Sequence, residues 1–245
     1  MAHASTGNRG AGLHLPDPEP ENLYERFPWL YAFCRDHLFR NDTEKIAAAL
    51  WPGIVPAEGS SLLDLGCGPG FYARRLAGRF EPLRVTGVDR SARQLRRARS
   101  LATALRLGNC SFEEGDVRAL AWPAGSVDAL VASRLFMVLS EPEQTVAEMY
   151  RVLKPGGRCF IAEPRSALRA SVPLQAMRLL APLADFGGER GRSYREPGGV
   201  SVLDGGGFRA LIKTQPWSAA RHWHDTWYQY ALCEKEKKDP GRDGT

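Results

Sequence analysis

A loop rich in glycine follows an apolar run and lets a ligand touch backbone atoms. Residues 62–65 are typical of a strand buried in a parallel sheet. The loop carries three glycines, Gly66, Gly68 and Gly70, which permit positive φ and lack the Cβ atom that would block a close approach. Because the helix-forming stretch 71–79 follows directly, the sequence predicts a strand-loop-helix cradle for the polar part of a cofactor.

The loop differs from the common nucleotide-binding loops. A dinucleotide fingerprint has the spacing Gly-x-Gly-x-x-Gly, whereas these glycines are more closely spaced and Pro69 lies between two of them. The Gly-Lys-Ser/Thr signature of a P-loop is also missing. Asp64 lies two residues before the first glycine, where a carboxylate repels a pyrophosphate and attracts a cation. The chemistry therefore favours a cofactor that carries a sulfonium and an ammonium group.

Further acidic signals follow the next two strand-like runs. Residues 83–88 favour a strand and end at Asp89, an acid well placed to bind a ribose diol, although an NAD enzyme would carry the same acid. Asp116 and Val117 follow the strand-like residues 110–113. The apolar strand 127–132 comes next, then a helix over 143–153, the turn 154–157 and a fifth strand over 158–162.

With these motifs, residues 60–164 resemble the class I S-adenosylmethionine-dependent methyltransferases, in particular the subgroup with quinone C-methyltransferases and many small-molecule methyltransferases. The resemblance implies an α/β fold with a Rossmann-like, doubly wound sheet. Its seven strands would have the order 3-2-1-4-5-7-6, with the last strand antiparallel. It also implies S-adenosyl-L-methionine as the cofactor. A chain of 245 residues with 43% hydrophobic residues is large enough to bury one such core.

The resemblance also implies which residues hold the cofactor. Asp64 and the glycine loop would hold the methionine end, and Asp89 would bind both ribose hydroxyls. Arg90 would cover the adenine face, and Asp116 would meet the adenine amino group. The full predicted set is Asp64, Gly66, Cys67, Gly68, Gly70, Asp89, Arg90, Asp116, Val117 and Ser133.

The remaining segments are predicted to flank a single domain over residues 23–234. Gly, Pro, Ser and charged residues dominate 1–22, so this tail and the tail 235–245 are predicted to be disordered. The aromatic segment 23–59 is predicted to be a helical lid, with Tyr24 and Tyr31 closest to the ligands, although its aromatics could simply pack on the sheet.

The segment after the fifth strand is less generic. Residues 165–207 are predicted to form an insertion that caps the acceptor, with a helix-like stretch at 172–184, although a surface loop is an equally good interpretation. A sixth strand is expected over 208–215. The last strand, 225–233, would then lie between the fifth and the sixth strands in space.

A general base is needed only if the acceptor must lose a proton. The candidates are His222, His224, Glu163 and Tyr31. The alternative for the histidines is an ordinary surface position. The alternative for Glu163 is an ion pair with Arg165 or a nearby arginine. The loop over 135–142 has no histidine where many family members carry one, so the acceptor of any one relative is not transferred to this chain.

Composition limits the partners. The net charge of +5 derives in large part from arginines at 90–99, which we interpret as the solvated face of a helix rather than a nucleic-acid surface. The five cysteines are scattered without the spacing of metal ligands, so no metal site is predicted. The same pattern predicts that the protein resides in the reducing cytoplasm. No apolar run reaches the length of a membrane span, so stable membrane insertion is not expected.

These observations predict a cytoplasmic monomer or homodimer that transfers a methyl group to an O, N or C atom of a small molecule by in-line displacement. One alternative is a quinone or lipid methyltransferase that works at the membrane surface. Another is a protein that binds S-adenosylmethionine without methyl transfer. The glycine spacing disfavours an NAD-dependent oxidoreductase.

Overall fold

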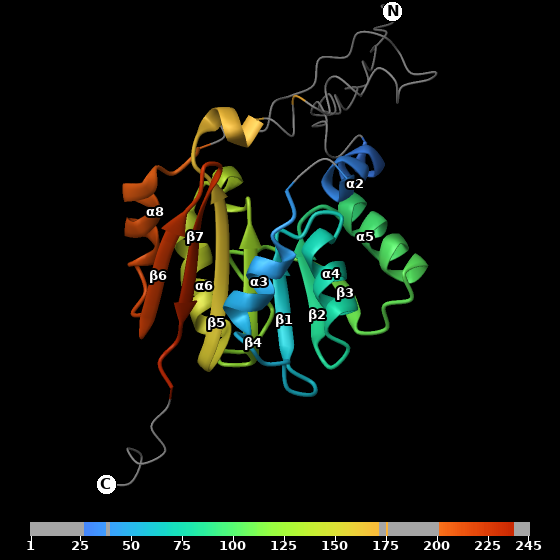
Figure 1. The fold of residues 1–245 in the computed structure, drawn as a ribbon, viewed down its shortest axis with the longest axis horizontal. Helices are drawn as coiled ribbons and strands as arrows, with labels where there is room; N and C mark the ends of the chain where they lie inside the picture. The colour runs from blue at the N-terminus through green and yellow to red at the C-terminus, as the bar shows by residue number, and fades with distance from the viewer. Residues whose placement is uncertain (1–26, 38–39, 172–174, 176–200, 238–245) are drawn as a thin grey trace, which may run out of the picture.

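The computed structural model describes residues 27–37, 40–171, 175 and 201–237. These residues form one seven-stranded sheet with helices on both faces (Figure 1). The strands are β1 Ser61–Leu65, β2 Arg84–Asp89, β3 Cys110–Glu114, β4 Val127–Ser133, β5 Leu153–Pro164, β6 Ala219–His224 and β7 Tyr228–Glu234.

Sheet topology agrees with the prediction. The strand order is β3-β2-β1-β4-β5-β7-β6, and β7 runs antiparallel to both of its neighbours while the other pairs are parallel. The Rossmann-like doubly wound fold and the place of the last strand between the fifth and the sixth are therefore confirmed. In such a sheet, ligands bind outside the carboxyl ends of the strands, near the switch in strand order between β1 and β4.

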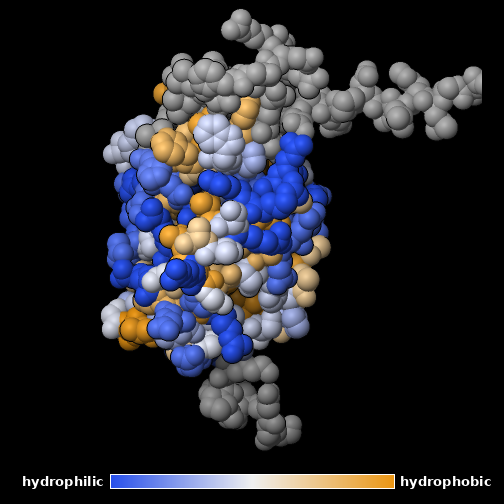
Figure 2. Space-filling model, turned by 90° about the vertical axis from the view of Figure 1, so that its right-hand side faces the viewer, coloured by the Kyte–Doolittle hydropathy of each residue, from blue (hydrophilic) through white to orange (hydrophobic). Residues whose placement is uncertain are grey.

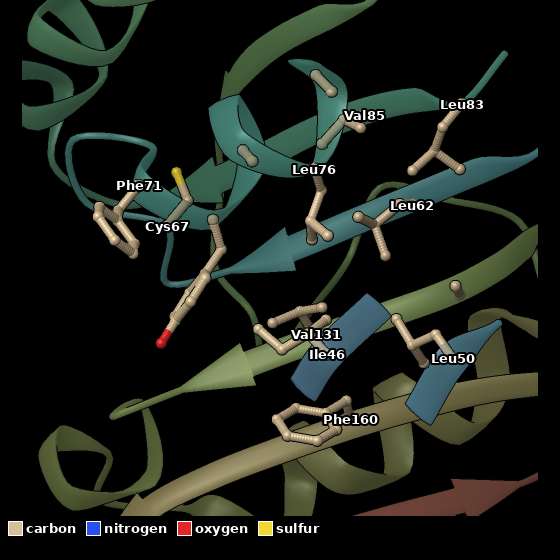
Figure 3. Close-up of a cluster of buried hydrophobic side chains, with 14 of the residues drawn as sticks. Ile46, Leu50, Leu62, Cys67, Phe71, Leu76, Leu83, Val85, Val131 and Phe160 are labelled. Atoms are coloured by element: carbon tan, nitrogen blue, oxygen red, sulfur yellow. The ribbon is translucent and has the colours of Figure 1, made fainter. Parts of the chain in front are cut away.

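Helices bury one face each against the sheet (Figure 1). The helices α3 Thr43–Leu50, α4 Phe71–Arg79 and α5 Ala92–Ala104 cover one face. The helices α6 Pro142–Val152 and α8 Gly205–Ile212 cover the other. Figure 3 shows how aliphatic and aromatic side chains of α3, α4 and the central strands meet in the core of the first face.

The helix α2 Pro28–His37 lies above the carboxyl edge of the sheet, close to α4 and α5 (Figure 1). It begins at Pro28, whose fixed φ suits the first helical position. Its last turn carries Arg35 and His37, where positive charge is favourable to the helix dipole. The helix therefore forms where the sequence places the lid, although Tyr24 lies outside the described residues.

Polar side chains fix the starts of several helices. Asn41 Oδ1 accepts hydrogen bonds from the Thr43 backbone N–H (3.0 Å) and the Thr43 hydroxyl (2.6 Å), and α3 begins there. Ser91 Oγ accepts from the Gln94 N–H at 3.3 Å and caps α5. These side chains satisfy amide groups that have no partner within the helix.

The C-terminal third corrects one expectation. Residues 208–215, predicted as the sixth strand, belong mainly to the helix α8, and the sixth strand is β6 at Ala219–His224. Two physical features decide this. Asp204 Oδ1 caps the helix by accepting from the Gly207 N–H at 2.6 Å. Phe208, Leu211 and Ile212 have helical spacing and are buried beside α6.

Other boundaries differ less. The fifth strand begins at Leu153, before the expected turn, and its register with β4 shifts near Ala129. Lys235, assigned to the C-terminal tail by the sequence, donates to the carbonyl oxygens of Tyr150 (2.7 Å) and Leu153 (2.8 Å). Most of the predicted acceptor cap and the predicted N-terminal tail lie outside the described residues.

Several arginines of α5 are exposed, as the sequence predicts. Arg93 and Arg96 are exposed, whereas Leu95 and Ala98 are fully buried. Arg99 differs, because its Nη2 donates to the Phe112 carbonyl oxygen of β3 at 2.7 Å. Figure 2 faces this side of the molecule, where hydrophilic residues dominate the surface and apolar residues appear in small separate areas.

We predict that Gly70→Ala lowers the free energy of unfolding by about 3 kcal/mol, because a Cβ atom would strain a left-handed backbone and crowd a core ring. Gly70 has φ +74°, and its added Cβ would lie 2.5 Å from Phe112 Cε1. The matched control is Gly53→Ala, with φ +70° and no atom within 4 Å of the added Cβ. Its expected loss is about 1 kcal/mol from the backbone alone. Equal urea midpoints for the two variants would contradict the packing part of this prediction.

Candidate active site

The ends of β1, β2 and β4 form the site at the carboxyl edge of the sheet. A small cavity opens there beside the glycine loop. Asp64, Gly66, Cys67 and Ser133, all predicted cofactor residues, line this cavity. It is completed by residues from α2, from the glycine loop, from the start of α4 and from the loop after β4, namely Tyr31, Arg35, Pro69, Phe71, Tyr72 and Arg134.

Asp64 is a buried carboxylate, with 3% of its surface exposed. Its Oδ2 accepts a hydrogen bond at 3.0 Å from the Ala73 N–H, in the first turn of α4. Burial raises the pKa of Asp64 to about 7, because removal from water penalises the charged form. A cation placed in the cavity would favour the ionised carboxylate, so this side chain suits a positively charged ligand group.

Asp89 joins the end of β2 to the glycine loop. Its Oδ2 accepts from the Gly68 N–H and its Oδ1 from the Ser91 N–H, each at 2.8 Å. Each carboxylate oxygen has about two acceptor sites, so both oxygens retain capacity for a hydroxyl donor. Asp89 therefore lies against the loop as expected for an acid that binds a ribose diol.

At the predicted adenine end, Asp116 is an exposed residue that pairs with Arg118. Arg118 Nη2 donates to Asp116 Oδ2 at 2.7 Å, and this guanidinium holds the pKa of Asp116 below its usual value. Val117 is buried in the core, and Arg90 is exposed. Six of the ten predicted cofactor residues do not line the cavity, namely Gly68, Gly70, Asp89, Arg90, Asp116 and Val117.

The cavity is covered by α2. The ring of Tyr31 lies over Gly68, since a Cβ added to that glycine would be 3.4 Å from Tyr31 Cε1. Burial raises the pKa of Tyr31, so its hydroxyl stays protonated near neutral pH and acts as a hydrogen-bonding group.

Two contacts fasten α2 to α4. The buried Arg74 donates from Nη2 to Asp36 Oδ1 at 2.9 Å. The Arg35 guanidinium stacks over the Phe71 ring, with its carbon 3.7 Å from the ring centroid. Arg35 was missed by the sequence reasoning, since a basic residue in the last turn of a helix is ordinary and its partner lies 36 residues away.

Glu163 lies at the end of β5 and is 3% exposed. Its Oε1 accepts from the backbone N–H groups of Leu135 (2.7 Å) and Phe136 (3.0 Å), at the start of the 3-10 turn η1 Phe136–Val138. Burial raises the pKa of Glu163 to about 7. The suggested ion pair with Arg165 is not formed, because Arg165 donates instead to the Asp225 carbonyl oxygen. Glu163 thus positions the loop after β4.

The two histidines lie on β6, the edge strand of the sheet. β6 is four strand positions from β1, about 19 Å at the usual strand spacing. His222 packs against Phe208 of α8, with 5.4 Å between ring centroids. His224 is exposed. Of the four candidate bases, Tyr31 is the one that lines the cavity.

Arg134 follows β4 and lines the cavity beside Ser133. Its φ of +58° is in the left-handed region. Nη1 donates to the Tyr228 hydroxyl at 3.0 Å, and Nη2 donates to the Ala170 carbonyl oxygen at 2.8 Å. The positive φ and both hydrogen-bond partners of Arg134 are visible only in the fold.

Comparisons with known proteins agree with this site. The model of a methyltransferase domain family matches residues 62–157. Trans-aconitate 2-methyltransferase of Variovorax paradoxus is 30% identical over 209 residues, which cover 84% of this chain and 74% of that relative. Demethylmenaquinone methyltransferase of Deinococcus radiodurans is 37% identical over 114 residues, or 45% of this chain and 47% of the relative. The chain spans about half the length of most of the curated relatives it matches.

A solved structure shows the same fold at low sequence identity. The 4+2 cyclase SpnF matches with a TM-score of 0.64 and 18% identity, over 89% of this chain and 97% of that chain. Within the part of the chain that the structure describes, no helix combines the length and hydropathy needed to cross a membrane.

We predict that Glu163→Gln stabilises the protein at high pH. The pKa of Glu163 rises from 4.5 to about 7 in the folded state, so its stabilising effect is complete below pH 4.5 and is lost as the pH rises through 7. Glutamine keeps an oxygen for the two backbone donors and does not ionise. The variant is expected to exceed the wild type by about 3 kcal/mol at pH 8.5 and to match it at pH 4.

Urea unfolding at the two pH values measures this difference. Glu58→Gln, at an exposed glutamate, is the control and should follow the wild type at both. A gap between Glu163→Gln and the wild type that is the same at pH 4 and pH 8.5 would show that Glu163 does not titrate in this range.

Proposed function

The chain belongs to the class I S-adenosylmethionine-dependent methyltransferases, and we propose that it transfers a methyl group to an O, N or C atom of a small molecule by in-line displacement. One observation carries the proposal. Two carboxylates, Asp64 and Asp89, flank a glycine loop at the carboxyl edge of the sheet, where the cavity opens.

The residues fit the cofactor of this family. When bound, S-adenosylmethionine supplies an electrophilic methyl group on a positively charged sulfur. We propose that Asp64 attracts the cationic methionine end, that Asp89 accepts from the ribose hydroxyls, and that Asp116 turns from Arg118 toward the adenine. Tyr31 and the rest of α2 exclude water above the loop. Alignment of reacting groups in such a dry site contributes up to about 7–11 kcal/mol in model systems.

The acceptor has to approach from the side of β4 and β5, opposite the acids of β1 and β2. Ser133 and Arg134 line the cavity at the end of β4, and Tyr31 lines it from α2. His222 and His224 remain predicted bases only for an acceptor that extends toward β6. Glu163 acts through the backbone amides it accepts. We therefore favour an acceptor that is already nucleophilic, or one activated by Tyr31 as a hydrogen-bonding partner.

The relatives do not settle which acceptor is used, because one is named for trans-aconitate and another for demethylmenaquinone. We propose a cytoplasmic protein, since all five cysteines are free thiols. It would act as a monomer or homodimer without nucleic acid. The fold neighbour titled a cyclase is a reason to keep a third option, a protein that binds S-adenosylmethionine without transferring its methyl group.

The decisive experiment combines cofactor binding with methyl transfer. Asp89→Asn should weaken binding of S-adenosylmethionine by about 1.5–3 kcal/mol, because charge-assisted hydrogen bonds to the ribose are lost. Calorimetry measures this affinity. Glu113→Gln, at an exposed acid on the neighbouring strand β3, is the matched control and should bind as the wild type does. The same proteins are incubated with methyl-labelled cofactor and a small-molecule extract.

Label in small molecules with the wild type and with Glu113→Gln, but reduced with Asp89→Asn, is the expected result. Label on macromolecules alone would overturn the proposed substrate class. Tight binding of the cofactor with no labelled product would instead favour the protein that binds without methyl transfer. Unchanged affinity in Asp89→Asn would remove Asp89 from the binding site.

A membrane-surface methyltransferase is the second candidate, favoured by two exposed aromatic residues on α2. Trp29 and Phe33 lie one turn apart and are 47% and 50% exposed. Aromatic residues on one helix face suit the interface of a bilayer. If this face docks, the wild type should sediment with anionic liposomes and Trp29→Ser/Phe33→Ser should not. Wild-type protein that stays in the supernatant would exclude this candidate.

A further inference from the structure

Arg134 adopts a backbone conformation that its residue type disfavours. Its φ of +58° lies in the left-handed region, which is uncommon outside glycine, asparagine and aspartate. The conformation is held from the β5 side, because the Arg134 N–H donates to the Ala162 carbonyl oxygen at 2.8 Å. Disfavoured backbone at the edge of a cavity is a reason to look for a function of the side chain.

Two contacts from β7 and from the segment after β5 fix the orientation of the Arg134 side chain. The Tyr228 hydroxyl on β7 and the Ala170 carbonyl oxygen, shortly after β5, accept from its two terminal nitrogens. These two hydrogen bonds fix the plane of the guanidinium group. The Tyr228 bond reaches across β5, so the guanidinium lies over the strands that do not carry the cofactor acids.

A second cation in the same cavity lies on the opposite side. Arg35 stacks on Phe71 and Tyr72 of α4, with 3.7 and 4.7 Å from its guanidinium carbon to the ring centroids. It is therefore close to the glycine loop and to the predicted cofactor residues. The two arginines have separate surroundings and, in our interpretation, separate anions to bind.

We propose that Arg134 binds an oxyanion of the methyl acceptor, a carboxylate or a phosphate, and so restricts the enzyme to anionic small molecules. The planar guanidinium fork matches the oxygens of either group. This inference rests on the proposed function and names the substrate class of the same site. It assigns the selectivity to a side chain that acts on binding of the acceptor, while the cofactor is held by other residues.

A fractionated extract tests the proposal even though the acceptor is unidentified. A small-molecule extract is separated on an anion exchanger into a retained, anionic fraction and a flow-through of neutral and cationic compounds. Each fraction is incubated with methyl-labelled S-adenosylmethionine and the wild type, Arg134→Gln, Arg134→Lys or Arg165→Gln. Arg165 is an exposed arginine near the end of β5 and is the matched control.

We expect label only from the anionic fraction. Dilution of that fraction gives an apparent KM, which should rise at least tenfold in Arg134→Gln and less in Arg134→Lys, with Arg165→Gln unchanged. The cofactor affinity of Arg134→Gln should stay within threefold of the wild type, which a merely structural role of Arg134 would not require. Phosphatase treatment of the fraction abolishes labelling if the oxyanion is a phosphate and preserves it if it is a carboxylate.

Three results would overturn the proposal. Label from the flow-through would show a neutral or cationic acceptor and would leave the proposed methyl transfer intact. Label from the anionic fraction with the same apparent KM in Arg134→Gln and the wild type would remove Arg134 from acceptor binding. Bound cofactor without label from either fraction would overturn the proposed function together with this inference.

Discussion

Three acidic side chains at strand ends organise the site, because they accept hydrogen bonds from backbone N–H groups in the segments around it. Asp64 of β1 binds the amide of Ala73 in α4, and Asp89 of β2 binds the amides of Gly68 and Ser91. Glu163 of β5 binds two amides at the start of η1. Because each acid lies on a rigid strand and its amide partners lie in the segments that follow the strands, the sheet sets the loop positions. The cavity then takes its shape from the strand order.

This arrangement has a cost that its function explains. Asp64 and Glu163 are buried, and burial disfavours their charged forms, so the pKa of each rises to about 7. A buried acid is tolerated because the backbone donors replace part of the lost hydration. At the cofactor loop the same cost makes the site receptive to a cation, since a positive charge beside Asp64 relieves it. The negative charge on the buried Asp64 therefore destabilises the empty loop and favours the binding of a cationic ligand group.

Sequence patterns were sufficient for the part of the molecule in which local signals and the family motifs agree. The strand before the glycine loop, the helix after it and the strand that ends at Asp89 form where the sequence predicts them. The sixth strand does not, because an apolar run such as Phe208–Ile212 suits a strand or a helix. The N-cap at Asp204 and the burial of this run against α6 stabilise the helix. Arg35 was missed for a different reason, since its contacts with α4 depend on the docking of α2.

The two sides of the cavity differ in how they are built. The β1–β2 side consists of one contiguous stretch of chain in which acids and backbone amides contact one another, so it is recognisable in sequence. The β4–β5 side brings together Arg134, Ala170 and Tyr228, which are up to 94 residues apart and meet through the side chain of Arg134. Side-chain contacts of this kind change without disturbing the sheet. One strand order can therefore keep its cofactor while the opposite wall of the cavity accommodates different acceptors. The fold alone does not specify the acceptor, which depends on residues of that wall such as Arg134.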